Sequence, residues 1–164
     1  MSESITRSAE ISYSERLYTP WWCWPLPLIA GVLLAAEVHM GYPGVRAWLP
    51  YVVAVPLIVV LMLWLGRAKV RLDAGELWVG AKDPAHLPVR FIGELEVIEP
   101  RDKRQALGPD LDPAAFVTHR AWVGPMLRLH LTDPDDPTPY WLISTRSPGR
   151  LAELIRAERD MRRY

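Results

Sequence analysis

Two long uncharged runs near the N-terminus constrain the fold of this sequence more than any other feature. The first extends from Leu17 to Ala36 and the second from Ala47 to Gly66; each has 20 residues, and only ten residues separate them. An apolar helix needs about 20 residues to cross the hydrocarbon core of a bilayer. The pattern therefore predicts a transmembrane helical hairpin over residues 17–66, with spans at about 18–37 and 47–66.

The residues that flank the runs favour two uncleaved spans. Aromatic side chains prefer the membrane–water boundary, and they gather at the ends of both runs: Tyr18, Trp21, Trp22, Trp24 and Trp64 at one interface, Tyr42, Trp48 and Tyr51 at the other. The leader is mixed in charge and no good small-residue cleavage site follows the first run, which argues against a signal peptide. Gly31 and Ala35 form a small-xxx-small pair that would seat the second helix closely.

Basic residues near the ends of the spans predict the orientation, because such residues favour the cytoplasmic side. Arg46 is the only Lys or Arg residue in the link between the spans. The other side carries a larger basic set: Arg7, Arg16, Arg67, Lys69 and Arg71. We therefore expect a multi-pass protein of the inner cell membrane with both termini in the cytoplasm, beginning with a polar cytoplasmic tail over residues 1–16.

Residues 67–164 are expected to form one cytoplasmic domain. Apolar residues recur there with a period of about two, which is typical of strands with one buried face. Seven short strands are predicted: 69–72, 77–80, 87–92, 94–98, 116–123, 126–132 and 140–145. Asp73–Glu76 has the composition of a hairpin turn, Gly93 of a bend or bulge, and residues 100–113 of a long exposed loop.

The last segment has the pattern of an amphipathic helix. Ser147 is a favourable N-cap residue and Pro148 a favourable first helical residue. An apolar stripe at helical spacing would plug an open end of a small curved sheet; it consists of Leu151, Leu154, Ile155 and Met161.

The order of these elements resembles a known domain and a known family. Seven short strands followed by one amphipathic helix resemble a pleckstrin-homology-like (PH-like) barrel, and the matching segments are Val70–Leu72, Gly75–Val79, Leu87–Ile92 and Tyr140–Pro148. Through Tyr13–Leu17, the Pro20-Trp21-Trp22 entry and the two spans, the whole chain resembles the actinobacterial DUF3093 family of membrane proteins. The resemblance implies a membrane α-helical hairpin joined to an all-β PH-like seven-strand barrel with a C-terminal α-helix. It implies no activity and no catalytic residues.

Composition and the motifs in the sequence argue against several classes of function. The chain carries 19 Lys and Arg against 19 Asp and Glu, which argues against nucleic acid as a partner, because binding it calls for a basic excess. Cys23 is the only cysteine, so no intrachain disulfide is possible. Phosphate-cradling glycine loops, zinc-ligand spacings and a nucleophile beside a His–Asp pattern are missing. We therefore expect no enzyme activity, no cofactor and no metal.

Two basic clusters are the candidate binding residues. Arg67, Lys69 and Arg71 follow the second span directly, and Arg101, Lys103 and Arg104 lie in the predicted loop. A basic residue near a bilayer surface contributes about 1 kcal/mol of attraction to anionic lipid heads. The simpler interpretations are an orientation signal for the first cluster and a solvated loop for the second.

Two polar pairs are further candidate sites. If Gly124-Pro125 joins two antiparallel strands, His119 faces His130, and the pair would suit a metal or a pH sensor. A solvent-facing strand pair without a third ligand is the favoured interpretation. Glu37 and His39 end the first span, where an ordinary boundary charge is favoured over a proton relay.

These observations predict a membrane-anchored adaptor. The hairpin would hold the chain in the lipid bilayer, and the PH-like domain would bind a protein partner or a lipid headgroup at the inner membrane surface. The alternative is an accessory subunit of a membrane enzyme or transporter complex that packs through its two spans. The sequence does not identify the membrane or cytoplasmic protein partner.

Overall fold

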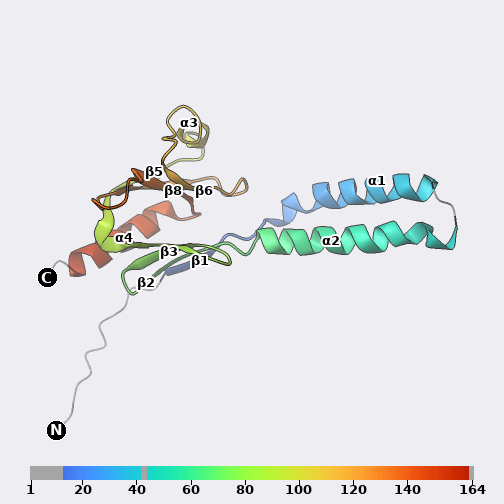
Figure 1. Ribbon diagram of the computed structural model, residues 1–164, viewed down its shortest axis with the longest axis horizontal. Coiled ribbons are helices and arrows are strands. Elements are labelled where there is room, and N and C mark those ends of the chain that lie inside the picture. The colour runs from blue at the N-terminus through green and yellow to red at the C-terminus, as the bar shows by residue number, and fades with distance from the viewer. Residues whose placement is uncertain (1–12, 42–43, 163–164) are drawn as a thin grey trace, which may run out of the picture. The chain divides into compact units, whose positions relative to one another are not determined.

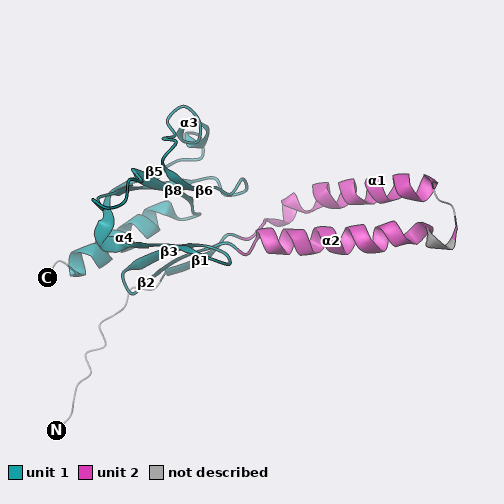
Figure 2. Ribbon diagram, in the orientation of Figure 1, with its two compact units in different colours: residues 1–17, 68–164 teal, residues 18–67 magenta. Residues whose placement is uncertain are grey.

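The computed structural model describes residues 13–41 and 44–162, which form two compact units. One unit consists of residues 18–67 and the other of residues 1–17 together with 68–164 (Figure 2). We call them the helical unit and the two-sheet unit. The expected tail residues 1–12, including Arg7, and the expected boundary residue Tyr42 lie outside the described residues.

The helical unit contains two apolar helices. They are α1 (Pro25–Gly41), preceded by the 3-10 turn η1 (Trp21–Cys23), and α2 (Leu49–Leu65), preceded by η2 (Val45–Trp48). The stretch Trp21–Gly41 is long and apolar enough to cross a membrane or to serve as a signal sequence. Helix α2 is also apolar but has 17 residues. Residues 13–41 and 44–162 thus contain one possible membrane-spanning helix beside a shorter apolar one.

The contact between α1 and α2 uses the small residues that the sequence singled out. Gly31 and Ala35 are the buried residues of α1. A Cβ atom on Gly31 would collide with Cδ1 of Ile58 in α2, so the missing side chain permits the close approach. Many large aliphatic residues elsewhere on both helices are exposed, among them Leu26, Ile29, Leu33, Val53, Leu57 and Leu63.

The two-sheet unit contains two four-stranded sheets and a C-terminal helix (Figure 1). The first sheet is antiparallel in the order β1 (Tyr13–Arg16), β2 (Lys69–Asp73), β3 (Glu76–Gly80), β4 (Ala85–Pro88). The second has the order β5 (Ile92–Ile98), β7 (Met126–Leu131), β8 (Tyr140–Ser144), β6 (Phe116–Thr118). The 3-10 turn η3 (Val89–Phe91) connects the sheets, α3 (Lys103–Ala106) follows β5, and α4 (Pro148–Met161) ends the unit.

This architecture corrects the predicted seven-strand barrel. There are eight strands among the described residues, and no pairing there joins the two sheets into a closed barrel. The predicted strand 87–92 is divided by η3, which carries the chain from the first sheet to the second. Gly93 does mark a bulge, because the register between β5 and β7 shifts between Ile92 and Leu95.

The additional strand, β1, comes from residues that were predicted to belong to a tail. Tyr13–Arg16 pair with β2 in antiparallel register, with Arg16 opposite Lys69. The backbone amide of Leu17 then donates to the carbonyl oxygen of Ala68 at 2.9 Å, and Leu17 is fully buried. The helical unit is therefore an insertion between two neighbouring strands of one sheet.

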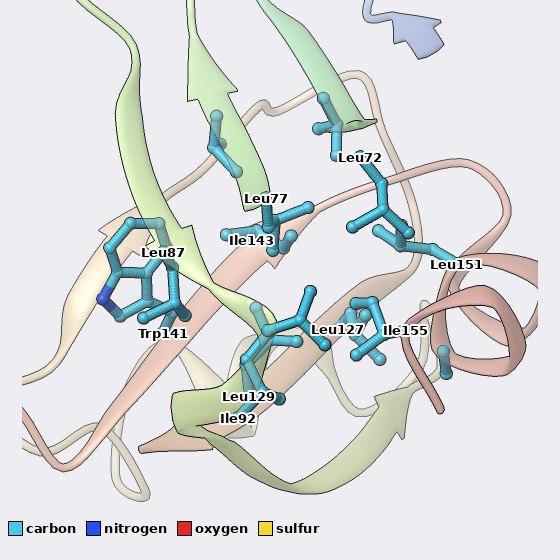
Figure 3. Packing of buried hydrophobic residues seen from close by; sticks show 14 of the residues in the cluster. Leu72, Leu77, Leu87, Ile92, Leu127, Leu129, Trp141, Ile143, Leu151 and Ile155 are labelled. Atoms are coloured by element: carbon cyan, nitrogen blue, oxygen red, sulfur yellow. The ribbon is translucent and has the colours of Figure 1, made fainter. Parts of the chain in front are cut away.

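The main core lies between the two sheets and α4 (Figure 3). Alternate residues of the strands point into it, as the predicted period of two requires; they include Val70, Leu72, Leu77, Val79, Leu127, Leu129 and Ile143. Leu151 and Ile155 of α4 are fully buried there. The predicted stripe is less complete than expected, since Leu154 is partly buried and Met161 is 54% exposed.

A second, smaller core involves part of the loop predicted at 100–113, most of which is exposed as expected. Ala106 and the partly buried Leu107 and Leu111 pack against Tyr140 and Leu142 on the other face of the second sheet. All five residues of β8 are therefore buried. The Tyr140 hydroxyl fixes this cover, because it donates to the carbonyl oxygen of Asp110 at 3.2 Å and accepts from the amide of Asp112 at 2.8 Å.

Candidate functional site: a basic and aromatic sheet face

The first sheet presents basic and aromatic side chains on its outer face. Successive side chains of a strand point to opposite faces, so burial of Val70 and Leu72 leaves Lys69 and Arg71 exposed on the other side of β2. The register places Arg16 opposite Lys69, and Trp78 opposite Arg71.

The next strand adds an aromatic partner to this surface. His86 on β4 lies opposite Trp78, and the two rings stack with centroids 5.0 Å apart and planes inclined at 27°. We call the surface formed by Arg16, Lys69, Arg71, Trp78 and His86 the basic face.

A groove of ≈ 430 Å³ crosses the basic face. Lys69, Arg71, Trp78 and Pro84 contribute to its wall, together with Asp73. Arg71 forms an ion pair with Asp73, and its side chain is 57% exposed. Exposed ion pairs contribute only about 0–1 kcal/mol, so little free energy is lost when an anionic ligand takes the place of Asp73. The arrangement suits an anionic group that also stacks or packs on an aromatic surface.

Of the first predicted cluster, Lys69 and Arg71 share the basic face. Arg67 is exposed and belongs to the helical unit. Trp78 and His86 were not predicted as site residues. The signal for Trp78 was present, because the Asp73–Glu76 turn fixes the β2–β3 register and so places residue 78 opposite residue 71.

The second predicted cluster is not gathered into one cationic surface. The Lys103 ammonium donates to the carbonyl oxygens of Arg120, at 3.0 Å, and of Val123, and burial lowers the pKa of Lys103. Arg101 lies 3.1 Å from a carboxylate oxygen of Glu99, whereas Arg104 is exposed. Lys103 therefore fastens α3 to a neighbouring loop and is occupied by protein groups.

The predicted pairing of His119 with His130 is wrong. Strand β6 ends at Thr118 and runs parallel to β8 instead of forming a hairpin with β7. His130 instead lies opposite Tyr140, with ring centroids 5.6 Å apart. His119 is exposed. Desolvation of its covered part, followed by the charges of Lys103 and Arg120, lowers the pKa of His119.

The remaining candidates have structural contacts. His39 packs edge-on against Tyr51 of α2, with centroids 5.9 Å apart, and Glu37 is exposed. The buried Ser144 hydroxyl accepts a hydrogen bond from the amide of Arg120 at 3.0 Å. Across residues 13–41 and 44–162, no three His, Cys, Asp or Glu side chains lie together as a metal site would require.

Comparison with known proteins identifies the family. A family model described as a protein of unknown function (DUF3093) matches residues 12–155, and the chain belongs to this family. The match begins just before β1 and ends within α4, so it includes both units. Neither the curated proteins nor the solved structures contain a significant match to the chain.

Proposed function

We propose that this protein is a membrane-anchored adaptor whose two-sheet unit binds anionic groups at the inner membrane surface through its basic face. The observation that carries the proposal is the juxtaposition of Lys69, Arg71 and Trp78 along one groove. Basic residues attract anionic headgroups, and a tryptophan ring suits the boundary between apolar chains and water.

The chain connection supports a position close to the bilayer. Only residues 66–68 separate the end of α2 from the start of β2. The four Cα–Cα steps from residue 65 to residue 69 reach at most about 14 Å. With the helices in the membrane, Lys69 therefore remains within that distance of the end of α2, and even a weak headgroup affinity is effective at such a high local concentration.

The membrane assignment is itself part of the proposal. We propose that α1 and α2 both span the inner membrane and that both termini are cytoplasmic. The exposed aliphatic surface of the two helices supports the spans, and Arg46 as the single basic residue of the link supports the orientation. The two-sheet unit with its C-terminal helix is proposed to be a distant variant of the PH-like fold.

The accessory-subunit alternative is less well supported. Helix association in membranes favours small residues at the contact. The small residue Gly31 already faces the chain's own second helix at Ile58, and Ala35 is the other buried residue of α1. The surface that remains consists of large aliphatic side chains, which suit lipid. The exposed basic face favours a ligand at the membrane surface over a partner within the membrane.

Vesicle binding by the two-sheet unit tests the proposal. Because Leu17 and Ala68 are joined by a backbone hydrogen bond, a short Asn-Gly turn in place of residues 18–67 gives a soluble form that keeps β1. After circular dichroism has verified its folding, this form is sedimented with anionic and with neutral vesicles. We expect binding to anionic vesicles only, weakened by salt, since screening shortens the range of the attraction to about 8 Å at physiological ionic strength.

Charge-matched variants assign the binding to a surface. Lys69→Gln with Arg71→Gln should abolish sedimentation, whereas Arg104→Gln with Arg156→Gln removes the same charge from exposed positions outside the basic face and should not. Equal sedimentation of all forms would overturn headgroup binding. Capture of one protein by the full chain in mild detergent, lost in the Lys69/Arg71 variant, would then identify the ligand of the basic face as a protein.

Reporter fusions test the orientation. A cytoplasm-specific fluorescent reporter after Tyr164 should be active, and a periplasm-specific phosphatase inserted at Gly44 should be active as well. Activity of a phosphatase fused after Tyr164 would mean that the C-terminus lies in the periplasm, the reverse of the proposed orientation. Absence of phosphatase activity at Gly44 would contradict the proposal that both helices span the membrane.

A further inference from the structure

Three arginines converge on a second cavity at a different edge of the two-sheet unit. The cavity has a volume of ≈ 240 Å³, and its wall consists of Arg90, Arg159 and Arg162 with Ile92, Gly93 and Thr132. Arg90 comes from η3, Arg159 from the last turn of α4, and Arg162 directly follows that helix. Residues 159 and 162 are three positions apart and so share one face of the helix.

The backbone holds Arg159 in place. Its Nη1 donates to the carbonyl oxygens of Ile92, at 3.3 Å, and Gly93, at 2.8 Å. Its Nε is buried and has no hydrogen-bond partner in the described structure. These two backbone hydrogen bonds hold the Arg159 guanidinium at the wall of the cavity.

A tight turn holds Arg162. Ala74 and Gly75 both have positive φ, +51° and +76°, which is the signature of a type I′ hairpin turn between β2 and β3. The positive φ favours glycine at position 75, and the guanidinium of Arg162 lies directly over Gly75, where a Cβ atom would displace it. The Arg162 Nε also pairs with the buried Glu158 at 2.9 Å.

The charges around the cavity are unbalanced. Its wall contains three guanidinium groups and no carboxylate. Glu158 pairs with Arg162, and Asp160 lies 4.0 Å from Arg159. Arg90 makes no ion pair among the described residues and stacks on the ring of Phe91 at 4.6 Å. Two of the three arginines thus have a carboxylate partner, and Arg90 brings a positive charge to the cavity without an ion pair among the described residues.

We propose that this arginine cavity is a binding site for a small phosphate-bearing anion. Guanidinium groups are planar forks of donors that match phosphate oxygens. The cavity is smaller than the 300–1,000 Å³ of typical drug-sized sites, which suits a single phosphate group with a small substituent. The ligand is a phosphate monoester, carried either by a soluble metabolite or by a lipid head.

The position of the cavity separates it from the basic face. Arg162 lies at the turn that follows Asp73, and Lys69 lies at the other end of β2, next to the connection to the helical unit. Four residue steps along a strand correspond to about 13 Å. One domain thus presents one basic surface near the membrane connection and one arginine cavity at the opposite end of the same strands.

The experiment uses the full chain in nanodiscs of phosphatidylcholine, with inorganic phosphate as the probe. Phosphate is titrated at constant ionic strength against chloride, and binding is measured by isothermal calorimetry. We expect saturable binding that is weakened at least about fivefold by Arg90→Gln and by Arg162→Gln. Arg156→Gln, an exposed arginine of the same helix outside the cavity wall, should bind as the wild type does.

A second arm distinguishes the two sources of phosphate. The same titration is repeated in nanodiscs that contain phosphatidic acid. Loss of phosphate binding there would assign the cavity to a lipid head, and unchanged binding would assign it to a soluble ligand. The proposal is overturned if the wild type shows no phosphate binding beyond the chloride control, or if the Arg90 and Arg162 variants, folded with unchanged melting temperatures, bind phosphate like the wild type.

Discussion

The carboxylate of Glu15 accepts a hydrogen bond from the hydroxyl of Thr145 at 2.6 Å, although 130 positions separate the two residues. The other oxygen of the same carboxylate accepts from the backbone amide of Arg146 at 2.8 Å. Thr145 is fully buried and directly follows β8. One side chain of β1 therefore joins the strand before the helical insertion to the connection that leads into α4.

Replacing Glu15 with alanine should destabilise the two-sheet unit. The change leaves the buried Thr145 hydroxyl and the Arg146 amide without their acceptor, and hydrogen bonds to a charged group contribute about 1.5–3 kcal/mol. We expect a loss of that size in the free energy of unfolding, measured by urea denaturation in mild detergent. Glu153→Ala, on an exposed position of α4, is the control and should change the value little.

Alkaline pH should lower the stability of the two-sheet unit, because Tyr13 ionises. Burial, and then the hydrogen bond to Glu15 and its negative charge, raise the pKa of Tyr13 to about 12. In the unfolded chain the phenol ionises near 10, so stability is complete below pH 10 and falls as the pH rises from 10 through 12. Absorbance titration should show a tyrosine that ionises near pH 12 and is missing in Tyr13→Phe; identical titration curves for the two proteins would contradict the assignment.

Local patterns made much of the two-sheet unit predictable. The Asp73–Glu76 turn, the Gly93 bulge and the start of α4 after Ser147 are set by residues close in sequence, and all three are found. Lys69 and Arg71 could be recognised by charge alone, but His86 enters the basic face only through a register between β3 and β4. A site that depends on long-range pairing is not visible in local composition.

The errors in the predicted strands have the same cause. Tyr13–Arg16 is short and polar, and it becomes a strand only because β2, more than 50 residues later, offers an edge. Gly124-Pro125 has the composition of a hairpin turn, yet the better partner of residues 116–118 is β8, which lies beyond β7 in the chain. In both cases tertiary pairing overrides the local signal.

Removing the positive charge of Lys103 should raise the pKa of the His119 ring. Burial, followed by the charges of Lys103 and Arg120, lowers the pKa of His119. Lys103→Met removes one of these positive charges, so the pKa should rise part of the way towards the ordinary value of 6.5. NMR titration of the His119 ring measures this shift. Arg104→Met, an exposed neighbour, should leave the titration where it is, and an unchanged His119 pKa in Lys103→Met would refute the coupling.

Enlarging Gly31 should disturb the contact between α1 and α2. A leucine there must displace Ile58, and overpacking of this kind costs about 1–3 kcal/mol. Gly31→Ala should cost less, because the atom it meets is the flexible end of the Ile58 side chain. Thermal melting in mild detergent measures the effect. Gly41→Leu, at a position with open space around it, is the matched control, and Ile58→Ala should partly restore Gly31→Leu.

Truncation of Ile155 tests whether α4 completes the main core. Ile155 is fully buried against both sheets, whereas Met161 on the same helix is 54% exposed. Removing a large buried aliphatic side chain costs about 2–5 kcal/mol, against a total stability of about 5–15 kcal/mol for a typical domain. Ile155→Ala should therefore lower the urea midpoint of the two-sheet unit strongly, and Met161→Ala should leave it nearly unchanged. Equal midpoints for the two variants would mean that α4 does not hold the sheets together, and the arginine cavity at its end would then lose its support.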